Sequence, residues 1–199
     1  MNKIKKLVIL GCLIMLITGC KDIFTRENET VDYLSGKHYV EMSIKNYGKV
    51  EIELDADIAP ITVTNFMNLV KSESYNGNKI HRVSHDFVIQ AGDNIESDNI
   101  KGEFLANGVA NDISHKSGVI SMARAGGQTE GYNTASSQFF IVIEDSEYLD
   151  NYYAGFGHVT KGMDVIKKIN SKVTNTDRDG NILNDSDMPI IEYIKEIEK

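Results

Sequence analysis

The sequence predicts a mainly β fold, a barrel or sandwich whose ends are covered by two helices. Eight segments show the period-2 alternation or the short apolar runs that are typical of strands. Two further segments place apolar residues at helical spacing, and turns rich in Gly, Asn and Asp separate several of these segments. Many short strands with few helices favour a single β-barrel or β-sandwich domain.

Residues 40–45 and 50–55 predict the first two strands, because apolar and polar side chains alternate along both segments. Asn46-Tyr47-Gly48 lies between them, and Asn and Gly favour the tight turn of a hairpin. The two segments therefore predict an antiparallel β-hairpin.

The first helix is predicted to begin near Pro60, because proline suits the first turn of a helix. Val63, Phe66, Met67 and Val70 follow at the spacing of one helix face. This segment therefore predicts an amphipathic helix that packs against the sheet.

The remaining strands are predicted from apolar or alternating runs at residues 80–83, 87–91, 119–123, 139–143, 156–160 and 190–197. A second, short helix is predicted over residues 163–170, with Met163, Ile166 and Ile169 on one side. Residues 139–143 are apolar at consecutive positions. We therefore expect this strand to be covered on both faces, by the barrel interior and by a helix.

The N-terminal segment differs in composition from the rest of the chain and predicts a targeting signal. Lys3, Lys5 and Lys6 form a basic start, and residues 7–17 are almost entirely apolar. This pattern is typical of a secretory signal peptide, and the apolar run is shorter than the ~20 residues of a transmembrane helix. The run ends in Ile-Thr-Gly-Cys at residues 17–20, which resembles a bacterial lipobox.

A lipobox-like end implies that Cys20 is the lipidation site and that cleavage removes residues 1–19 as a lipoprotein signal peptide. Its acyl chains, such as palmitate, would hold the protein on the membrane, because two chains give stable anchoring. Residues 20–36 are mostly polar and predict a flexible tether. Residues 37–199 are predicted to form the domain. The predicted location is extracytoplasmic, lipid-anchored to the cell membrane.

The composition argues against several classes of function. The 199-residue chain has 21 Lys and Arg against 29 Asp and Glu, which gives a formal net charge of −8. We expect no nucleic-acid partner, because the body of the chain carries no cluster of basic residues. Two cysteines are too few for a disulfide framework or a four-thiolate zinc site. The sequence predicts neither a metal nor a cofactor, because it shows no P-loop or dinucleotide fingerprint.

Two weaker patterns indicate metal-dependent alternatives. His81 and His85 have the spacing of zinc ligands on a helix, but an arginine occupies the place of the general-base Glu and the segment predicts strand and turn. Residues 177–181 are rich in Asp and Asn, but the Gly and Glu positions of a calcium loop do not match. A polar turn before the last strand is favoured, and a zinc metallopeptidase stays a minor alternative.

Several blocks of the sequence are informative in combination. They are IHRV (80–83), FVIQAGD (87–93), SMARA (121–125), SSQFFI (136–141), YLD (148–150) and GFG (155–157). In this order they resemble the cyclophilin family of peptidyl-prolyl cis–trans isomerases, over roughly residues 37–199. The resemblance implies an eight-stranded antiparallel β-barrel capped by two α-helices.

The resemblance also implies a site whose members come from all of these blocks. Arg82 matches the family's catalytic arginine, and Gln90 and Phe87 are expected to act beside it. The residues expected to bind substrate are Val88, Ala123, Arg124, Gln138, Phe140, Tyr148, Leu149 and Tyr153. Apolar members of this set would seat a proline ring, the two glutamines would hold the peptide backbone, and the main chain at 123–124 would line the groove.

Rotation about a prolyl peptide bond needs no nucleophile and no metal. The barrier is ~18–20 kcal/mol, and uncatalysed X-Pro isomerisation is slow enough to limit folding. A permanently charged guanidinium at the prolyl nitrogen would stabilise the twisted amide more than the planar one. We therefore expect the substrate to be X-Pro bonds of exported polypeptides. We expect the protein to be a monomer. The alternative is a non-catalytic proline-peptide-binding or chaperone module on the same barrel.

Three positions depart from the family pattern. Tyr148 stands where many members carry Trp, which leaves sensitivity to cyclosporin-type inhibitors open. Val88 replaces a common Met and enlarges the expected pocket, and Tyr153 stands where a His is frequent. Residues 126–134 are rich in Gly and polar residues and are expected to form a loop beside the groove.

Overall fold

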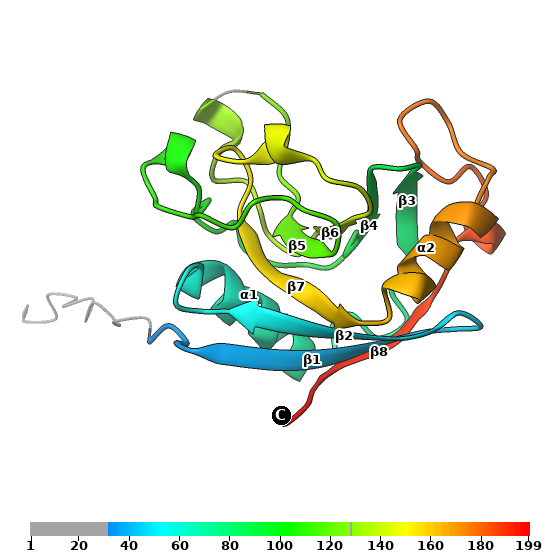
Figure 1. The fold of residues 1–199 in the computed structure, drawn as a ribbon, viewed down its shortest axis with the longest axis horizontal. Helices are drawn as coiled ribbons and strands as arrows, with labels where there is room; N and C mark the ends of the chain where they lie inside the picture. Colours follow the sequence, from blue (N-terminus) through cyan, green and yellow to red (C-terminus); the bar gives the residue numbers. More distant parts are fainter. Residues whose placement is uncertain (1–31, 128) are drawn as a thin grey trace, which may run out of the picture. The chain divides into compact units, whose positions relative to one another are not determined.

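The computed structural model describes residues 32–127 and 129–199, within which Tyr33–Lys199 form one compact unit. Eight antiparallel strands form one sheet that curls into a half-barrel, in the order β3-β4-β6-β5-β7-β2-β1-β8 (Figure 1). The strands are β1 (Lys37–Ile44), β2 (Gly48–Asp55), β3 (Ile80–Ser84), β4 (Val88–Ala91), β5 (Val119–Met122), β6 (Phe139–Val142), β7 (Gly155–Lys161) and β8 (Ile191–Glu196). The predicted fold class is confirmed, with strand ends that shift by a few residues.

The two edges of the sheet, β3 and β8, approach each other at one end. A single antiparallel bridge pairs Lys79 with Ile190. Next to it, the N–H of Gly77 donates to the carbonyl of Ile191 at 2.8 Å, and the N–H of Ile191 donates to the carbonyl of Asn78 at 2.8 Å. These bonds satisfy edge groups that would otherwise offer a template for pairing with another chain.

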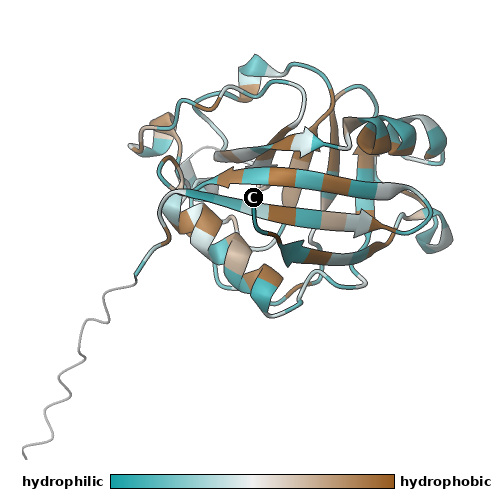
Figure 2. Cartoon of the chain, turned by 60° about the horizontal axis from the view of Figure 1, so that its bottom comes forward, coloured by the Kyte–Doolittle hydropathy of each residue, from teal (hydrophilic) through white to brown (hydrophobic). Residues whose placement is uncertain are grey.

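The two helices, α1 (Pro60–Lys71) and α2 (Met163–Lys172), lie at opposite ends of the curled sheet (Figures 1 and 2). Both were predicted, and both bury the apolar side that the spacing indicated. The Phe66 ring of α1 lies 5.2–5.5 Å from the rings of Tyr75, Phe139 and Phe156. This aromatic cluster fills the interior of the sheet and fixes α1 against it.

A distant carboxylate caps the N-terminus of α1. The buried side chain of Glu103 accepts the N–H of Ile61 at 3.1 Å and the N–H of Thr62 at 2.7 Å. A negative charge at this end also interacts favourably with the helix dipole. The N–H groups of the first turn are thereby satisfied from a segment 41–42 residues away.

Strand β6 is buried at all four positions, as its continuous apolar sequence predicted. Its outer face, however, is covered by loops that carry Ile113 and Tyr153 and by a single 3-10 turn, Glu147–Leu149, that carries Leu149. The expectation that a helix covers this outer face is therefore wrong. Helix α1 meets β6 on the inner face instead, where Phe66 contacts Phe139, and it packs mainly against β8 and β2, whereas α2 packs mainly against β2 and β3.

The predicted signal peptide, Cys20 and most of the predicted tether lie outside the described residues. Within them, the N–H of Leu34 donates to Thr64 Oγ1 at 2.8 Å, and the N–H of Gly36 donates to Asp57 Oδ1 at 2.7 Å. The last residues of the predicted tether therefore bind to the domain. None of the helices in 32–127 and 129–199 has the length and apolar character needed to cross a bilayer.

Candidate active site

The candidate site begins as one row of residues across the outer face of four strands. Arg82 on β3 pairs with Gln90 on β4, Gln90 pairs with Phe140 on β6, and Phe140 pairs with Ser121 on β5. Residues directly opposite each other on neighbouring strands point to the same face of the sheet. The register therefore places a cation, an amide, an aromatic ring and a hydroxyl side by side.

The polar half of this row is a directed chain of hydrogen bonds. Arg82 Nη1 donates to Gln90 Oε1 at 3.1 Å, and Gln90 Nε2 donates to Gln138 Oε1 at 2.8 Å. Gln138 Nε2 then donates to Asp93 Oδ1 at 3.1 Å. Because the chain begins at a donor-only guanidinium and ends at a carboxylate, both amide orientations are determined by their partners. Arg82 and the two glutamines are held as one unit.

The apolar half is a small cluster separate from the main core, which we call the outer cluster. Its buried members are Val88, Val119, Phe140, Val142 and Leu149, with Phe87, Ile113, Ala123 and Tyr153 partly buried at its margin. Tyr153 meets Phe140 edge to face, with the ring centroids 5.8 Å apart. These residues form an apolar face of the kind that accepts a pyrrolidine ring.

The two halves meet at Phe87. The Arg82 guanidinium carbon lies 5.9 Å from the Phe87 ring centroid. On its other side, Phe87 stacks with Tyr148 at a centroid distance of 5.8 Å, and Tyr148 is 69% exposed. The charged group, the apolar cluster and an accessible tyrosine are thus contiguous.

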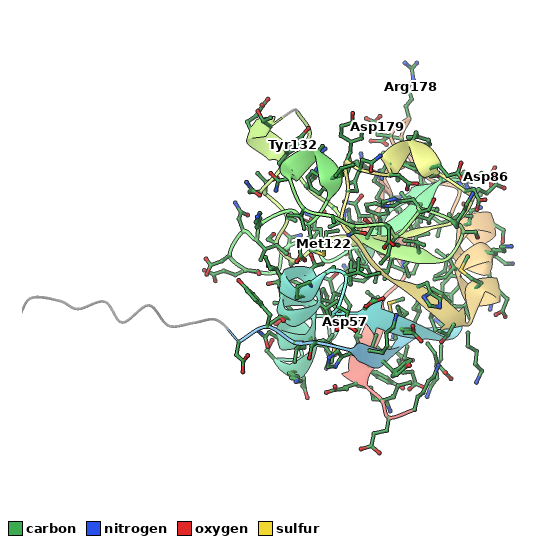
Figure 3. The ribbon with its side chains drawn as sticks, turned by 60° about the vertical axis from the view of Figure 1, so that its left-hand side comes forward. Asp57, Asp86, Met122, Tyr132, Arg178 and Asp179 are labelled. Carbon is green, nitrogen blue, oxygen red and sulfur yellow. The ribbon has the colours of Figure 1, made fainter. Side chains whose placement is uncertain are left out.

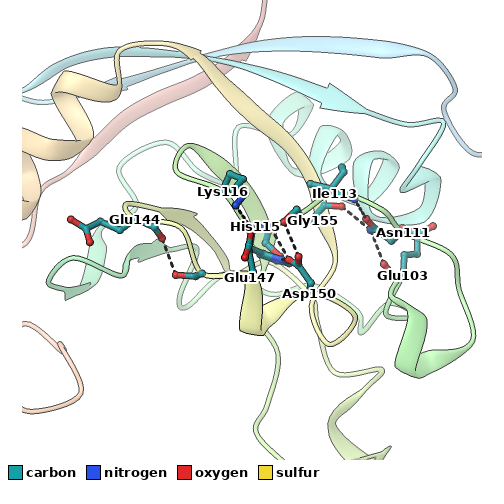
Figure 4. Close-up of polar contacts among 12 residues, drawn as sticks. Glu103, Asn111, Ile113, His115, Lys116, Glu144, Glu147, Asp150 and Gly155 are labelled. Atoms are coloured by element: carbon teal, nitrogen blue, oxygen red, sulfur yellow. Dashed lines mark hydrogen bonds and ion pairs between the residues drawn. The ribbon is translucent and has the colours of Figure 1, made fainter.

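A buried polar chain lies behind Phe140. His115 Nδ1 is 2.8 Å from Asp150 Oδ1 (Figure 4). His115 Nε2 is 3.0 Å from Ser121 Oγ, and the His115 ring stacks on Phe140 at a centroid distance of 6.2 Å. Burial lowers the pKa of His115, although the Asp150 carboxylate acts in the opposite direction. The order of groups resembles a hydrolase triad, but His115 and Ser121 are both 0% exposed, so a substrate cannot reach the hydroxyl. Their role is to support the Phe140 ring from behind.

Arg124 lies at the margin of the outer cluster, beside Tyr153. Its guanidinium carbon is 4.6 Å from the Tyr153 ring centroid and 5.2 Å from that of Tyr132. Its Nε donates to the carbonyl of Tyr152 at 3.0 Å. Contacts with rings and carbonyls hold this side chain beside the 126–134 loop.

Comparison with known proteins identifies the family of the chain and its architecture. The model of the family described as cyclophilin-type peptidyl-prolyl cis-trans isomerase matches residues 39–193. The chain belongs to the cyclophilin family. It is 41% identical to a peptidyl-prolyl cis-trans isomerase of Acinetobacter baylyi over 146 aligned residues, and the alignment covers 69% of this chain and 74% of that protein. It is 38% identical over 135 residues to peptidyl-prolyl cis-trans isomerase A of Dickeya dadantii, covering 64% and 68%.

Solved structures agree with this assignment at the level of the fold. A cyclophilin-type isomerase of Cryptosporidium parvum superposes with a TM-score of 0.70 at 22% identity, covering 82% of this chain and 99% of that one. A second structure of that protein, in the presence of the dipeptide Ala-Pro, gives a TM-score of 0.68 at 23% identity and covers 81% and 99%. The family model and the curated relatives, rather than the shared fold, identify this cyclophilin as an enzyme of the peptidyl-prolyl cis–trans isomerase type.

The structure brings the predicted site residues of the cyclophilin together around the outer cluster. Arg82, Gln90 and Gln138 form the polar chain, and Phe87 joins it to the apolar face. Four predicted residues, Val88, Phe140, Leu149 and Ala123, belong to the outer cluster or its margin. Tyr148, Tyr153 and Arg124 lie at its rim. Their catalytic and binding roles remain predictions.

Sequence reasoning missed some neighbours of these residues in the cyclophilin. Val142 and Val119 share the outer face with Phe140 and Ser121, because they lie two positions away on the same strands. The alternation along each strand could therefore have identified both. His115 was missed because its contact with Phe140 joins a loop to a strand, a relation that has no local period.

The minor metallopeptidase alternative fails on secondary structure. His81 lies in β3 and His85 in the exposed turn that follows, so the helical spacing that it requires is not present there. Residues 177–181 form the predicted polar turn. Across 32–127 and 129–199, the structure contains no group of three or more acidic, His or Cys side chains arranged for a metal ion.

Proposed function

We propose that this cyclophilin accelerates X-Pro rotation in exported polypeptides, with Arg82 stabilising the twisted prolyl amide. The observation that carries the proposal is a guanidinium held in place beside an apolar face. Arg82 is bound through Nη1 to Gln90 and lies against Phe87, at the margin of the outer cluster. A proline ring seated on that cluster would bring its nitrogen next to the fixed charge.

The donors of Arg82 suit this role. A guanidinium has five N–H donors, and Arg82 uses two of its nitrogens to bind Asp179 and Gln90. Donors therefore remain for the prolyl nitrogen, whose lone pair leaves conjugation as the bond twists. Because this lone pair accepts a hydrogen bond well only in the twisted state, the interaction favours the transition state over the planar amide.

Gln90 is suited to hold the other side of the bond. Its Oε1 is occupied by Arg82, and one of its amide hydrogens is occupied by Gln138. The second amide hydrogen would hold the carbonyl of the residue before proline while the ring side turns. The structural neighbour obtained with the dipeptide Ala-Pro supports an X-Pro unit as the bound group.

The location is part of the same proposal. Residues 1–20 carry the basic start, the apolar run and the lipobox-like end described above. We propose that Cys20 is lipidated and anchors the enzyme to the outer side of the cell membrane. Cys20→Ala should leave an unprocessed or released protein, measured by mass and by fractionation with the membrane. Intact Met1 in the mature wild-type protein would contradict this.

The test of the mechanism is Arg82→Ala. We expect kcat/KM for an X-Pro peptide to fall by about 10²–10³, or ~3–4 kcal/mol of transition-state stabilisation, with an unchanged denaturant midpoint. Arg82→Lys should recover little, because a point charge lacks the planar fork. Lys167→Ala, which removes an exposed cation from α2, is the control for net charge. Near-wild-type turnover by folded Arg82→Ala would instead favour the non-catalytic binding module.

A further inference from the structure

A polar turn, residues 177–181, lies against the strand that carries Arg82. An antiparallel bridge pairs Arg82 with Asn181. On either side of it, the N–H of Val83 donates to the carbonyl of Gly180 at 2.8 Å, and the N–H of Ile182 donates to the carbonyl of His81 at 2.9 Å. The turn thus continues the sheet beyond its edge strand, β3.

This turn makes a direct bond to the guanidinium. Arg82 Nε donates to the backbone carbonyl of Asp179 at 2.7 Å, in addition to the bond from Nη1 to Gln90. Two bonds from different nitrogens of a rigid, planar group determine the direction of its plane as well as its position. The Asp179 carbonyl therefore contributes to the direction in which the remaining donors of Arg82 point.

The side chain of Asp177 holds the turn in shape. Its Oδ1 accepts the N–H of Asp179 and the N–H of Asn181, each at 2.9 Å, and its Oδ2 accepts Nδ2 of Asn181 at 2.9 Å. Such bonds from an aspartate to N–H groups two or more residues later are typical of turns. The hydrogen bond from the Asn181 side chain, followed by those from the backbone, lowers the pKa of Asp177.

Gly180 allows the turn to approach β3 closely. Its φ of +87° is a conformation that other residues rarely adopt. A Cβ at this position would also lie 2.8 Å from Ser84 Cα and 2.8 Å from the carbonyl oxygen of Val83. The carbonyl of Asp179 can reach Arg82 only because the backbone packs this tightly.

We propose that Asp177 is a positioning residue for catalysis: through the turn 177–181 it fixes the Asp179 carbonyl that aligns Arg82. The proposal rests on the catalytic role of Arg82 argued above. The turn is not arranged for a cation, because both oxygens of Asp177 already face N–H donors. Asp177 itself is exposed, and the neighbouring Arg178 side chain extends away from the body of the molecule (Figure 3).

The first experiment measures kcat and KM of Asp177→Ala for an X-Pro peptide. We expect kcat to fall roughly tenfold with KM changed less than about twofold, because misplacing a catalytic group by 1 Å can cost as much as about 10²-fold. Asp177→Asn keeps an oxygen acceptor and should retain most of the activity. Asp187→Ala is the matched control. Its carboxylate also accepts side-chain donors from its own segment, from Asn175 and Asn184, but it makes no bond to the turn 177–181 described above. It should leave kcat unchanged.

A double-mutant cycle separates positioning from a general structural effect. In an Arg82→Ala background, Asp177→Ala should cause no further loss of kcat, because the group that it aligns is absent. The Nε–H resonance of Arg82 should also shift and exchange faster with water in Asp177→Ala. If Asp177→Ala is too unstable to assay, Asn181→Ala, which removes one donor to Asp177, should give a smaller loss in the same parameter.

The outcomes are distinguishable. Wild-type kcat in Asp177→Ala, or an equal loss in both backgrounds, would overturn the positioning role while the proposed mechanism stands. Wild-type kcat in Arg82→Ala would overturn the mechanism and the positioning role together. A loss confined to the background that contains Arg82, with Asp187→Ala unaffected, would establish Asp177 as a positioning residue.

Discussion

The outer face of the sheet is built in two ways in its two halves. On β1 and β2 it carries charged side chains that bind one another, such as Glu41 with Lys49 at 3.0 Å and with the Tyr193 hydroxyl at 2.9 Å. Figure 2 shows the alternation of hydrophilic and hydrophobic residues along these strands. On β4, β5 and β6 the same face carries the outer cluster, which loops cover only in part.

The difference shows how a function can be added to a fold without changing its interior. Both halves bury an apolar inner face, represented by Ile52 on β2 and Ile141 on β6, each 0% exposed. The two halves differ in the polarity of the alternate residues that face outward. Where these residues are charged, the sheet faces water, and where they are apolar and flanked by Arg82 and Gln90, we propose that the sheet binds a proline ring.

Adjacent residues of β6 should separate the two functions of that strand. Ile141→Ala removes side-chain volume from the main core and should lower the free energy of unfolding by about 3–4 kcal/mol, with little change in kcat/KM of the folded protein. Phe140→Ala removes the ring from the outer cluster and should reduce stability and substrate binding together. Denaturant titration and isomerase kinetics on both variants are the measurements. Equal losses of activity per folded molecule would contradict the division between faces.

The N-terminus of α1 should depend on the side chain of Glu103. Its carboxylate caps α1, and its carbonyl accepts Asn111 Nδ2 at 2.8 Å, while the same amide group also donates to the Gly155 carbonyl at 2.8 Å (Figure 4). Glu103→Ala leaves buried N–H groups unsatisfied and should cost about 2 kcal/mol of unfolding free energy. Hydrogen exchange of the Ile61 and Thr62 amides should accelerate. An unchanged denaturant midpoint would show that water replaces the cap.

Acid should weaken the support behind Phe140. Burial lowers the pKa of His115 below its ordinary 6.5, so the unfolded chain takes up this proton first as the pH falls. The free energy of unfolding should therefore decrease below pH 6.5, down to the folded pKa, and be independent of this group above 6.5. Burial lowers the pKa of His81 as well, so His115→Gln should remove only part of the slope. Denaturant titrations between pH 5 and 7 on both proteins are the measurement, and identical slopes would contradict the assignment.

The charged half should tolerate substitution with the smallest effect. Glu41→Gln disrupts the contacts with Lys49 and Lys195 and should change the free energy of unfolding by less than about 1 kcal/mol. The difference between variant and wild type should become smaller still at high salt, because salt screens exposed ion pairs. Isomerase kinetics should stay at the wild-type level, because this face lies on other strands than the site. A measurable loss of kcat/KM would show that the two halves are coupled.

Local pattern in the sequence determined the elements of this protein. The alternation over 40–45 and 50–55 predicted the hairpin because side-chain direction has period two in a strand, and β1 and β2 pair in that way. The continuous apolar run over 139–143 predicted a strand buried on both faces, and β6 is such a strand. Even the proximity of Arg82 and Gln90 follows locally, because both lie in the hairpin β3–β4.

Only the tertiary structure decided what lies around these elements. The Asp179 carbonyl and Arg82 are 97 residues apart in the sequence, and Glu103 lies 41–42 residues from the N–H groups that it caps. Loops and a short 3-10 turn, which carry Ile113, Leu149 and Tyr153, cover the outer face of β6 in place of an α-helix. The period of apolar residues in the sequence predicts whether a side chain is buried, but it does not predict which residue that side chain contacts. The partner depends on how the sheet curls and where each loop returns, which are properties of the whole chain.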